Sequence, residues 1–152
     1  MTPRLNAFDG YLGQIKPLIE FGTIVQERID PTLRELVKIR ASQINGCAIC
    51  LHMHANTARA NGETEERLLM LDAWRNSPLY SERERAALGW TEALTRVAET
   101  HAPDDAYDAL RTQFSEEEQV DLTLLIGAIN SFNRLGVGFR VNHPDQAQRK
   151  AA

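Results

Sequence analysis

The chain has 152 residues, which suits one globular domain with its own hydrophobic core. Its 43% hydrophobic and 25% charged residues are average for soluble proteins and argue against disorder or a fibrous architecture. The formal net charge is −4, and the basic residues are scattered along the chain, so we expect no nucleic-acid partner.

Signals for secretion or membrane insertion are not apparent. Residues 1–17 lack the apolar stretch and small-residue cleavage site of a secretory signal. The longest apolar run, 122–129, is much shorter than the roughly 18 residues that cross a bilayer. We therefore expect a cytoplasmic protein without a membrane partner.

Apolar residues recur at three- and four-residue steps along most of the chain, which predicts an all-α fold. The first helix precedes residue 30, and Pro17 is expected to break or kink it. A second helix begins at Pro31 and ends near Gly46. A third helix covers about 47–60, before Asn61 and Gly62.

The next two helices are separated by a break at residues 76–78. A short helix covers 64–74. Ser81, with Glu84 three residues later, has the spacing of a capping box, in which each residue bonds the backbone N–H of the other. The helix that it opens is expected to reach about residue 97.

The last predicted helices cover 105–114 and 120–132. Ser115 and Glu118 form a second candidate capping box ahead of the apolar helix. Glycines at 136 and 138 disfavour a rigid helix beyond it, and the polar tail from about 143 to 152 is expected to be loose.

The two cysteines form a Cys-x-x-Cys pair, which in a reducing compartment indicates catalysis or metal binding. On a helix, Cys47, Cys50 and His54 fall within roughly 60° of one another and share a face. Such a group is hard to explain by core packing alone. His52 points away from this face and is interpreted as an ordinary half-buried or exposed side chain.

Physical arguments alone do not decide which cysteine is the nucleophile. His54 is four residues after Cys50, so its imidazole can accept the thiol proton of Cys50. The partial positive charge at a helix N-terminus instead favours a thiolate on Cys47.

Zinc is the main competing interpretation, because Cys-x-x-Cys followed by His supplies suitable ligands. A closed structural zinc site needs four ligands, and His101 and His143 lie far away in sequence. We therefore predict neither a metal nor a bound cofactor.

Glu35 lies on the second predicted helix, twelve residues before Cys47. Its position near Leu36 and Ile39 would allow it to orient His54, directly or through a water. Its charged neighbours, among them Lys38, favour a solvated helix face instead, and spacing alone supports this second interpretation.

The pattern of Glu35, Cys47, Cys50 and His54 resembles the alkylhydroperoxidase D family, within the carboxymuconolactone decarboxylase-like superfamily. The segments 35–63, 74–88 and 126–136 also resemble the core of that family. The resemblance covers about residues 17–140 and implies an all-helical bundle. We therefore treat 1–152 as one alkylhydroperoxidase D-like domain.

The resemblance implies a thiol-dependent alkyl hydroperoxide reductase. Cys50 would attack the peroxide, His54 would be its base, Glu35 would be the relay carboxylate, acting partly through water, and Cys47 would resolve the product. An external dithiol, such as a dihydrolipoyl-bearing protein, would be the reductant, and the family assembles as trimers or hexamers.

Other functions are compatible with parts of this pattern. The same residues could serve a disulfide reductase or redox partner, which attacks a disulfide sulfur instead of a peroxide. Decarboxylation of a lactone acid would not need two thiols. A homo-oligomer is also expected from the sequence, because the apolar helix together with Trp74 and Trp90 offers more apolar surface than a thin bundle buries.

Overall fold

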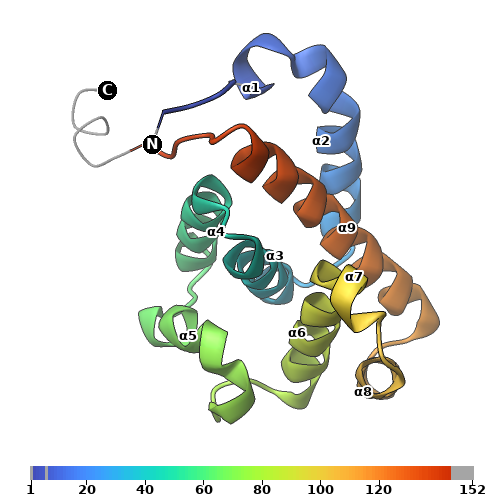
Figure 1. Ribbon diagram of the computed structural model, residues 1–152. Coiled ribbons are helices and arrows are strands. Elements are labelled where there is room, and N and C mark those ends of the chain that lie inside the picture. The colour runs from blue at the N-terminus through green and yellow to red at the C-terminus, as the bar shows by residue number, and fades with distance from the viewer. Residues whose placement is uncertain (1, 6, 145–152) are drawn as a thin grey trace.

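The computed structural model describes residues 2–5 and 7–144 (Figure 1). Within these residues there are helices and no β-strand, which confirms the predicted all-α fold. The elements in chain order are α1 (Ala7–Gly10), α2 (Leu12–Gln26), α3 (Pro31–Asn45), α4 (Ala48–Ala60), α5 (Glu65–Met70), the 3-10 helix η1 (Leu71–Asn76), α6 (Glu82–Thr95), α7 (Val97–Thr100), α8 (Asp104–Gln113) and α9 (Glu116–Gly138).

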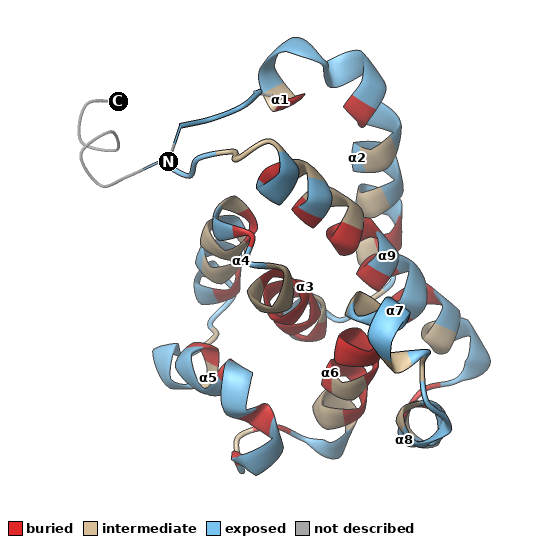
Figure 2. Ribbon diagram, in the orientation of Figure 1, coloured by how far each residue is buried: buried red, intermediate tan, exposed pale blue. Residues whose placement is uncertain are grey.

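Helix α3 lies at the centre of the fold and packs against α4, α6 and α9 (Figure 1). It begins where expected, because the side chain of Asp30 accepts hydrogen bonds from the backbone N–H groups of Thr32 and Leu33, both at 3.0 Å. It ends at Gly46, whose φ of 68° is in the left-handed region that favours glycine. Residues 35–42 in the middle of the helix are all buried, whereas both of its ends are more exposed (Figure 2).

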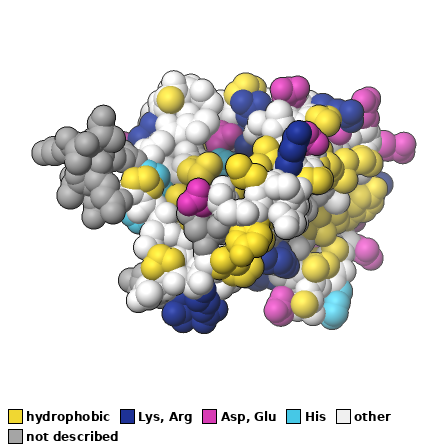
Figure 3. All heavy atoms as spheres, turned by 90° about the horizontal axis from the view of Figure 1, so that it is seen from above, with side chains coloured by type: hydrophobic (Ala, Val, Ile, Leu, Met, Phe, Trp, Pro, Cys, Tyr) yellow, Lys and Arg dark blue, Asp and Glu magenta, His cyan; other side chains and the backbone are white. Residues whose placement is uncertain are grey.

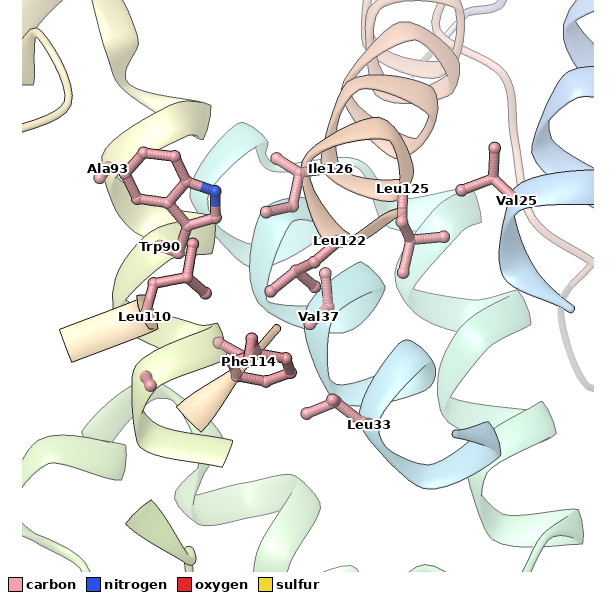
Figure 4. Close-up of a cluster of buried hydrophobic side chains, with 12 residues drawn as sticks. Val25, Leu33, Val37, Trp90, Ala93, Leu110, Phe114, Leu122, Leu125 and Ile126 are labelled. Carbon is pink, nitrogen blue, oxygen red and sulfur yellow. The ribbon is translucent and has the colours of Figure 1, made fainter. Parts of the chain in front are cut away.

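Two apolar clusters hold α3 in place. The first joins α3 to α6, α8 and α9 through side chains that include Val37, Trp90 and Ile126 (Figure 4). The second surrounds Leu36 and contains Trp74. Each fully buried aliphatic side chain of this kind stabilises the fold by about 1.5–3 kcal/mol, so the two clusters fix the position of α3.

Both predicted capping boxes are present. The backbone N–H of Glu84 donates to Ser81 Oγ at 3.2 Å, and the backbone N–H of Ser81 donates to Glu84 Oε2 at 2.8 Å. Ser115 and Glu118 form the same pair of bonds, at 3.3 and 2.8 Å. These caps start α6 and α9 where the sequence indicates.

Pro17 does not end α2, because the carbonyl that the ring leaves unpaired belongs to Gly13 in an exposed first turn, where water can reach it. Two predicted helix ends were wrong. Helix α6 ends at Thr95, before a short break at Arg96. Helix α9 continues to Gly138, because its packing against α2, α3 and α4 outweighs the low helix propensity of glycine.

The N-terminal segment lies beside the end of α9. The backbone N–H of Arg4 donates to the carbonyl of Phe139 at 3.0 Å, and its guanidinium donates to the carbonyl of Gly138 at 3.1 Å. Most of the tail that we expect to be loose, residues 145–152, lies outside the described residues. In the described part of the chain, no helix is both long and apolar enough to span a membrane.

Candidate active site

Cys47 and Cys50 are joined by a disulfide, with their Cα atoms 5.3 Å apart. Helix α4 begins one residue later than expected, at Ala48, so Cys47 is its N-cap and Cys50 lies in its first turn. The unpaired N–H groups of this turn are therefore close to both cysteines. The helix dipole consequently does not single out Cys47 as the nucleophile.

His54 contacts Glu35 across the interface between α4 and α3. Its Nδ1 lies 2.8 Å from Oε2 of Glu35, so the contact is direct and needs no bridging water. Glu35 is only 2% exposed. The interpretation of Glu35 as part of a solvated helix face was therefore wrong, because its side of α3 is covered by neighbouring helices.

Lys38 is a third polar member of this group, which the sequence analysis did not recognise. Its Nζ lies 3.0 Å from Oε1 of Glu35 and 2.7 Å from Oε1 of Gln26, on α2. Lys38 follows Glu35 by three residues, the spacing at which helical side chains meet. That spacing was the available signal, and it was interpreted as surface charge.

The charges of this group depend on one another. Burial raises the pKa of Glu35, but the hydrogen bond and charge of His54 and the charge of Lys38 outweigh it, so the pKa lies below the ordinary value. Burial lowers the pKa of Lys38, and the carboxylate of Glu35 offsets only part of that effect. Glu35 is therefore an ionised acceptor at neutral pH.

An ionised Glu35 fixes the orientation of the His54 ring. A carboxylate can only accept hydrogen bonds, so Nδ1 must carry the proton of the Glu35 contact. In the neutral imidazole, Nε2 is then the atom that can accept a proton. The arrangement is suitable for a general base.

A cavity of about 530 Å³ opens beside the disulfide. Cys50, His54 and Lys38 all line it, whereas Cys47 does not. The remaining lining residues are mainly apolar: Phe8, Ile19, Gly22, Thr23, Gln26, Ile49, Met53, Leu125, Ala128, Ile129, Phe132 and Val141. A cavity of this size and character suits a small organic molecule, and Cys50 is the sulfur that such a molecule would meet.

Cys47 is held behind Cys50 by a backbone hydrogen bond to Ser42 of α3, a residue that α9 contacts in turn. Its backbone N–H donates to the carbonyl of Ser42 at 3.0 Å. The side-chain amide of Asn133 donates to Ser42 Oγ, also at 3.0 Å. With 1% of its surface exposed, Cys47 is less accessible than Cys50, at 7%.

His52 lies away from this cavity, as its position on the helix indicates. It is half-buried, and its ring stacks on that of His143 with a centroid distance of 5.0 Å. Within residues 2–5 and 7–144, no three His, Cys, Asp or Glu side chains are grouped in a way that could hold a metal ion.

Comparison with known proteins identifies relatives of the chain. The model of the carboxymuconolactone decarboxylase family matches residues 18–93, a range that contains Glu35, both cysteines and His54. The uncharacterised protein YdfG of Bacillus subtilis is 46% identical over 112 residues, which are 74% of this chain and 76% of that protein.

Two solved structures are also similar. A protein of unknown function from Agrobacterium tumefaciens, suggested to be the antioxidant defence protein AhpD, is 44% identical with a TM-score of 0.92, covering 95% of this chain and 100% of that one. An uncharacterised peroxidase-related protein from Silicibacter has a TM-score of 0.78 at 20% identity, covering 93% and 75%, and shows the shared fold.

Proposed function

Because the chain belongs to the carboxymuconolactone decarboxylase family, we propose that it is a thiol-dependent reductase of organic hydroperoxides. One observation carries the proposal: Cys50 lines the cavity together with His54, while the disulfide partner of Cys50 is buried behind it. The similarity to a protein of unknown function that has been suggested to be the antioxidant defence protein AhpD supports a related activity.

The reaction starts from the dithiol form. Nε2 of His54 takes the proton of the Cys50 thiol, and the thiolate attacks the terminal oxygen of the hydroperoxide. An S–O bond forms as the O–O bond breaks, and the alkoxide leaves as an alcohol after taking a proton from His54. Cys50 is then a sulfenic acid.

The second half-reaction produces the disulfide present in the structure. The thiol of Cys47 attacks the sulfur of Cys50, water leaves, and the S–S bond forms. Two electrons from an external dithiol, which we propose to be a dihydrolipoyl-bearing protein, restore both thiols. The protein itself needs no bound cofactor for these steps.

The direct test is turnover with cumene hydroperoxide and dihydrolipoamide, compared with turnover of a model disulfide. We expect catalytic consumption of hydroperoxide that Cys50→Ser abolishes and His52→Ala leaves unchanged. Disulfide turnover without hydroperoxide consumption would identify a disulfide reductase instead. A lactone decarboxylase activity that survives replacement of both cysteines by serine would overturn the proposal.

A further inference from the structure

The ammonium group of Lys38 has one more N–H donor than it has side-chain acceptors in the described part of the chain. An ammonium group carries three N–H donors. In the described part of the chain, Nζ meets two side-chain acceptors, Glu35 and Gln26. Lys38 is only 6% exposed and lines the cavity beside Cys50 and His54. Its third donor is therefore available to a molecule in the cavity.

Positive charge exceeds negative charge around this donor. On α3, Glu35 faces both Lys38 and Arg34, whose Nε lies 3.6 Å from the carboxylate. The cavity residues contributed by α2 and α9 carry no charge, and α4 contributes only Cys50 and His54 as titratable groups. One carboxylate thus balances two cations, which favours an anionic oxygen near Lys38.

We propose that Lys38 binds the reacting oxygen of a ligand whose apolar body lies in the cavity. Side chains such as Ile129 and Phe132 would contact the apolar part, and the third N–H of Lys38 would donate to the oxygen. The site would accordingly select amphiphiles with an anionic oxygen in the head group over neutral amphiphiles of the same length.

For a hydroperoxide, this inference rests on the proposed function and gives Lys38 a catalytic role. As the O–O bond breaks, negative charge develops on the leaving alkoxide oxygen. The ammonium of Lys38 stabilises that charge until His54 returns the proton. A donor fixed in advance by Glu35 and Gln26 needs little reorganisation to do so, which is how enzymes stabilise developing oxyanions.

A binding measurement tests the inference without relying on peroxide chemistry. Decanoate, with an apolar chain and an anionic head group, should protect Cys50 of the reduced protein from alkylation by iodoacetamide. Decanol serves as the neutral probe of equal chain length. In the wild type, we expect decanoate to protect at a concentration at least about tenfold lower than decanol.

The variant Lys38→Met keeps the length of the side chain and removes its charge. It should weaken protection by decanoate at least about tenfold and change protection by decanol about twofold or less. Lys38→Arg should retain most of the effect. Equal protection by the two probes in the wild type contradicts the inference, whether or not Lys38→Met folds.

A comparison of two reaction rates distinguishes direct contact of Lys38 with the substrate from an indirect effect of Lys38 on the Cys50 thiol. Iodoacetamide alkylates Cys50 without releasing an oxygen anion. The ratio of the peroxide rate to the alkylation rate therefore measures how far a variant changes the stabilisation of the leaving oxygen. Lys38→Met should lower this ratio at least about tenfold, whereas His52→Ala, which lies outside the cavity, should leave it unchanged. If Lys38→Met slows both reactions equally, Lys38 acts only through the thiol, and its assigned catalytic role is wrong.

Failure of the proposed function would be recognised separately. A wild-type protein that is alkylated normally but does not react with hydroperoxide refutes the peroxidase activity. If protection by decanoate still depends on Lys38 in that case, the binding site stands and its substrate has a different reactive group.

Discussion

Gly136 of α9 lies directly against the sulfur of Cys47. A Cβ atom at position 136 would be 2.6 Å from Sγ of Cys47 and 3.5 Å from Sγ of Cys50. Real Cβ atoms do not approach sulfur so closely, so α9 can pack beside the disulfide because residue 136 has no side chain. Gly136, whose low helix propensity disfavours a helix at this position, is therefore required for α9 to pack against the disulfide.

Gly136→Ala is expected to destabilise the disulfide form more than the dithiol form, because a free Cys47 thiol can rotate away from the new methyl group. Overpacking of this kind costs about 1–3 kcal/mol, so the equilibrium should shift about fivefold or more towards the dithiol. Thiol counts after equilibration in redox buffers of defined dithiothreitol ratio measure this shift. Gly127→Ala, also in α9 but with open space around it, is the matched control and should not shift it.

His54→Ala should slow alkylation of the reduced Cys50 at neutral pH by about 10²-fold, since a positioned base typically contributes that much or more. Glu35→Gln should have a smaller effect, because it leaves the imidazole in place without its ionised partner. Stopped-flow alkylation measures both variants. His52→Ala lies outside the cavity and should react like the wild type; a similar loss in this control would point to general disruption of α4.

The stability of the fold should depend on the ionisation of Glu35. Its pKa in the folded protein lies below the ordinary value of 4.5, so the unfolded chain binds more protons between the two values. The contribution of Glu35 is thus complete above about pH 4.5 and is lost as the pH falls through the folded pKa. Urea unfolding of the wild type and Glu35→Gln should show a stability difference that shrinks at acidic pH. A difference independent of pH would contradict this assignment.

A homo-oligomer remains a prediction, but Trp74 and Trp90 do not provide its contact surface. Trp74 and Trp90 are 6% and 8% exposed within one chain, so they belong to its core. The exposed apolar residues of α9 include Val120 and Leu124, which lie one turn apart and are 58% and 38% exposed. Figure 3 shows hydrophobic side chains lying next to one another on one face of the molecule.

Burial of Val120 and Leu124 against a second copy would account for their exposure here. Leu124→Glu should then shift the sedimentation of the protein towards a 17.1 kDa species. A wild type that sediments only at that mass would refute the oligomer.

The sequence predicted helices well where local chemistry determines their ends. Asp30 and the two Ser/Glu pairs cap their helices through contacts within three residues, so the spacing alone was informative. The continuation of α9 through Gly136 depends on contacts with Cys47, about ninety positions away in the sequence. No periodicity in the sequence contains that information.

In the candidate site, too, the sequence predicted the residues that lie on one short segment and not those whose burial depends on distant helices. The helical spacing of Cys47, Cys50 and His54 indicated their chemistry from one short segment. The burial of Glu35 and Lys38 depends on the helices that cover α3, so their charges were consistent with a solvated face until the packing was known. Family resemblance selected Glu35 and did not select Lys38.

The number of free thiols before and after treatment with one equivalent of hydroperoxide tests the central claim most directly. The wild type should change from two free thiols to none, with an intramolecular mass loss of about two hydrogens. Cys47→Ser should instead stop at a sulfenic acid on Cys50, detectable by trapping with dimedone. If Cys50→Ser is oxidised at Cys47 as fast as the wild type, then Cys47 is the nucleophile and the assignment of Cys50 is wrong.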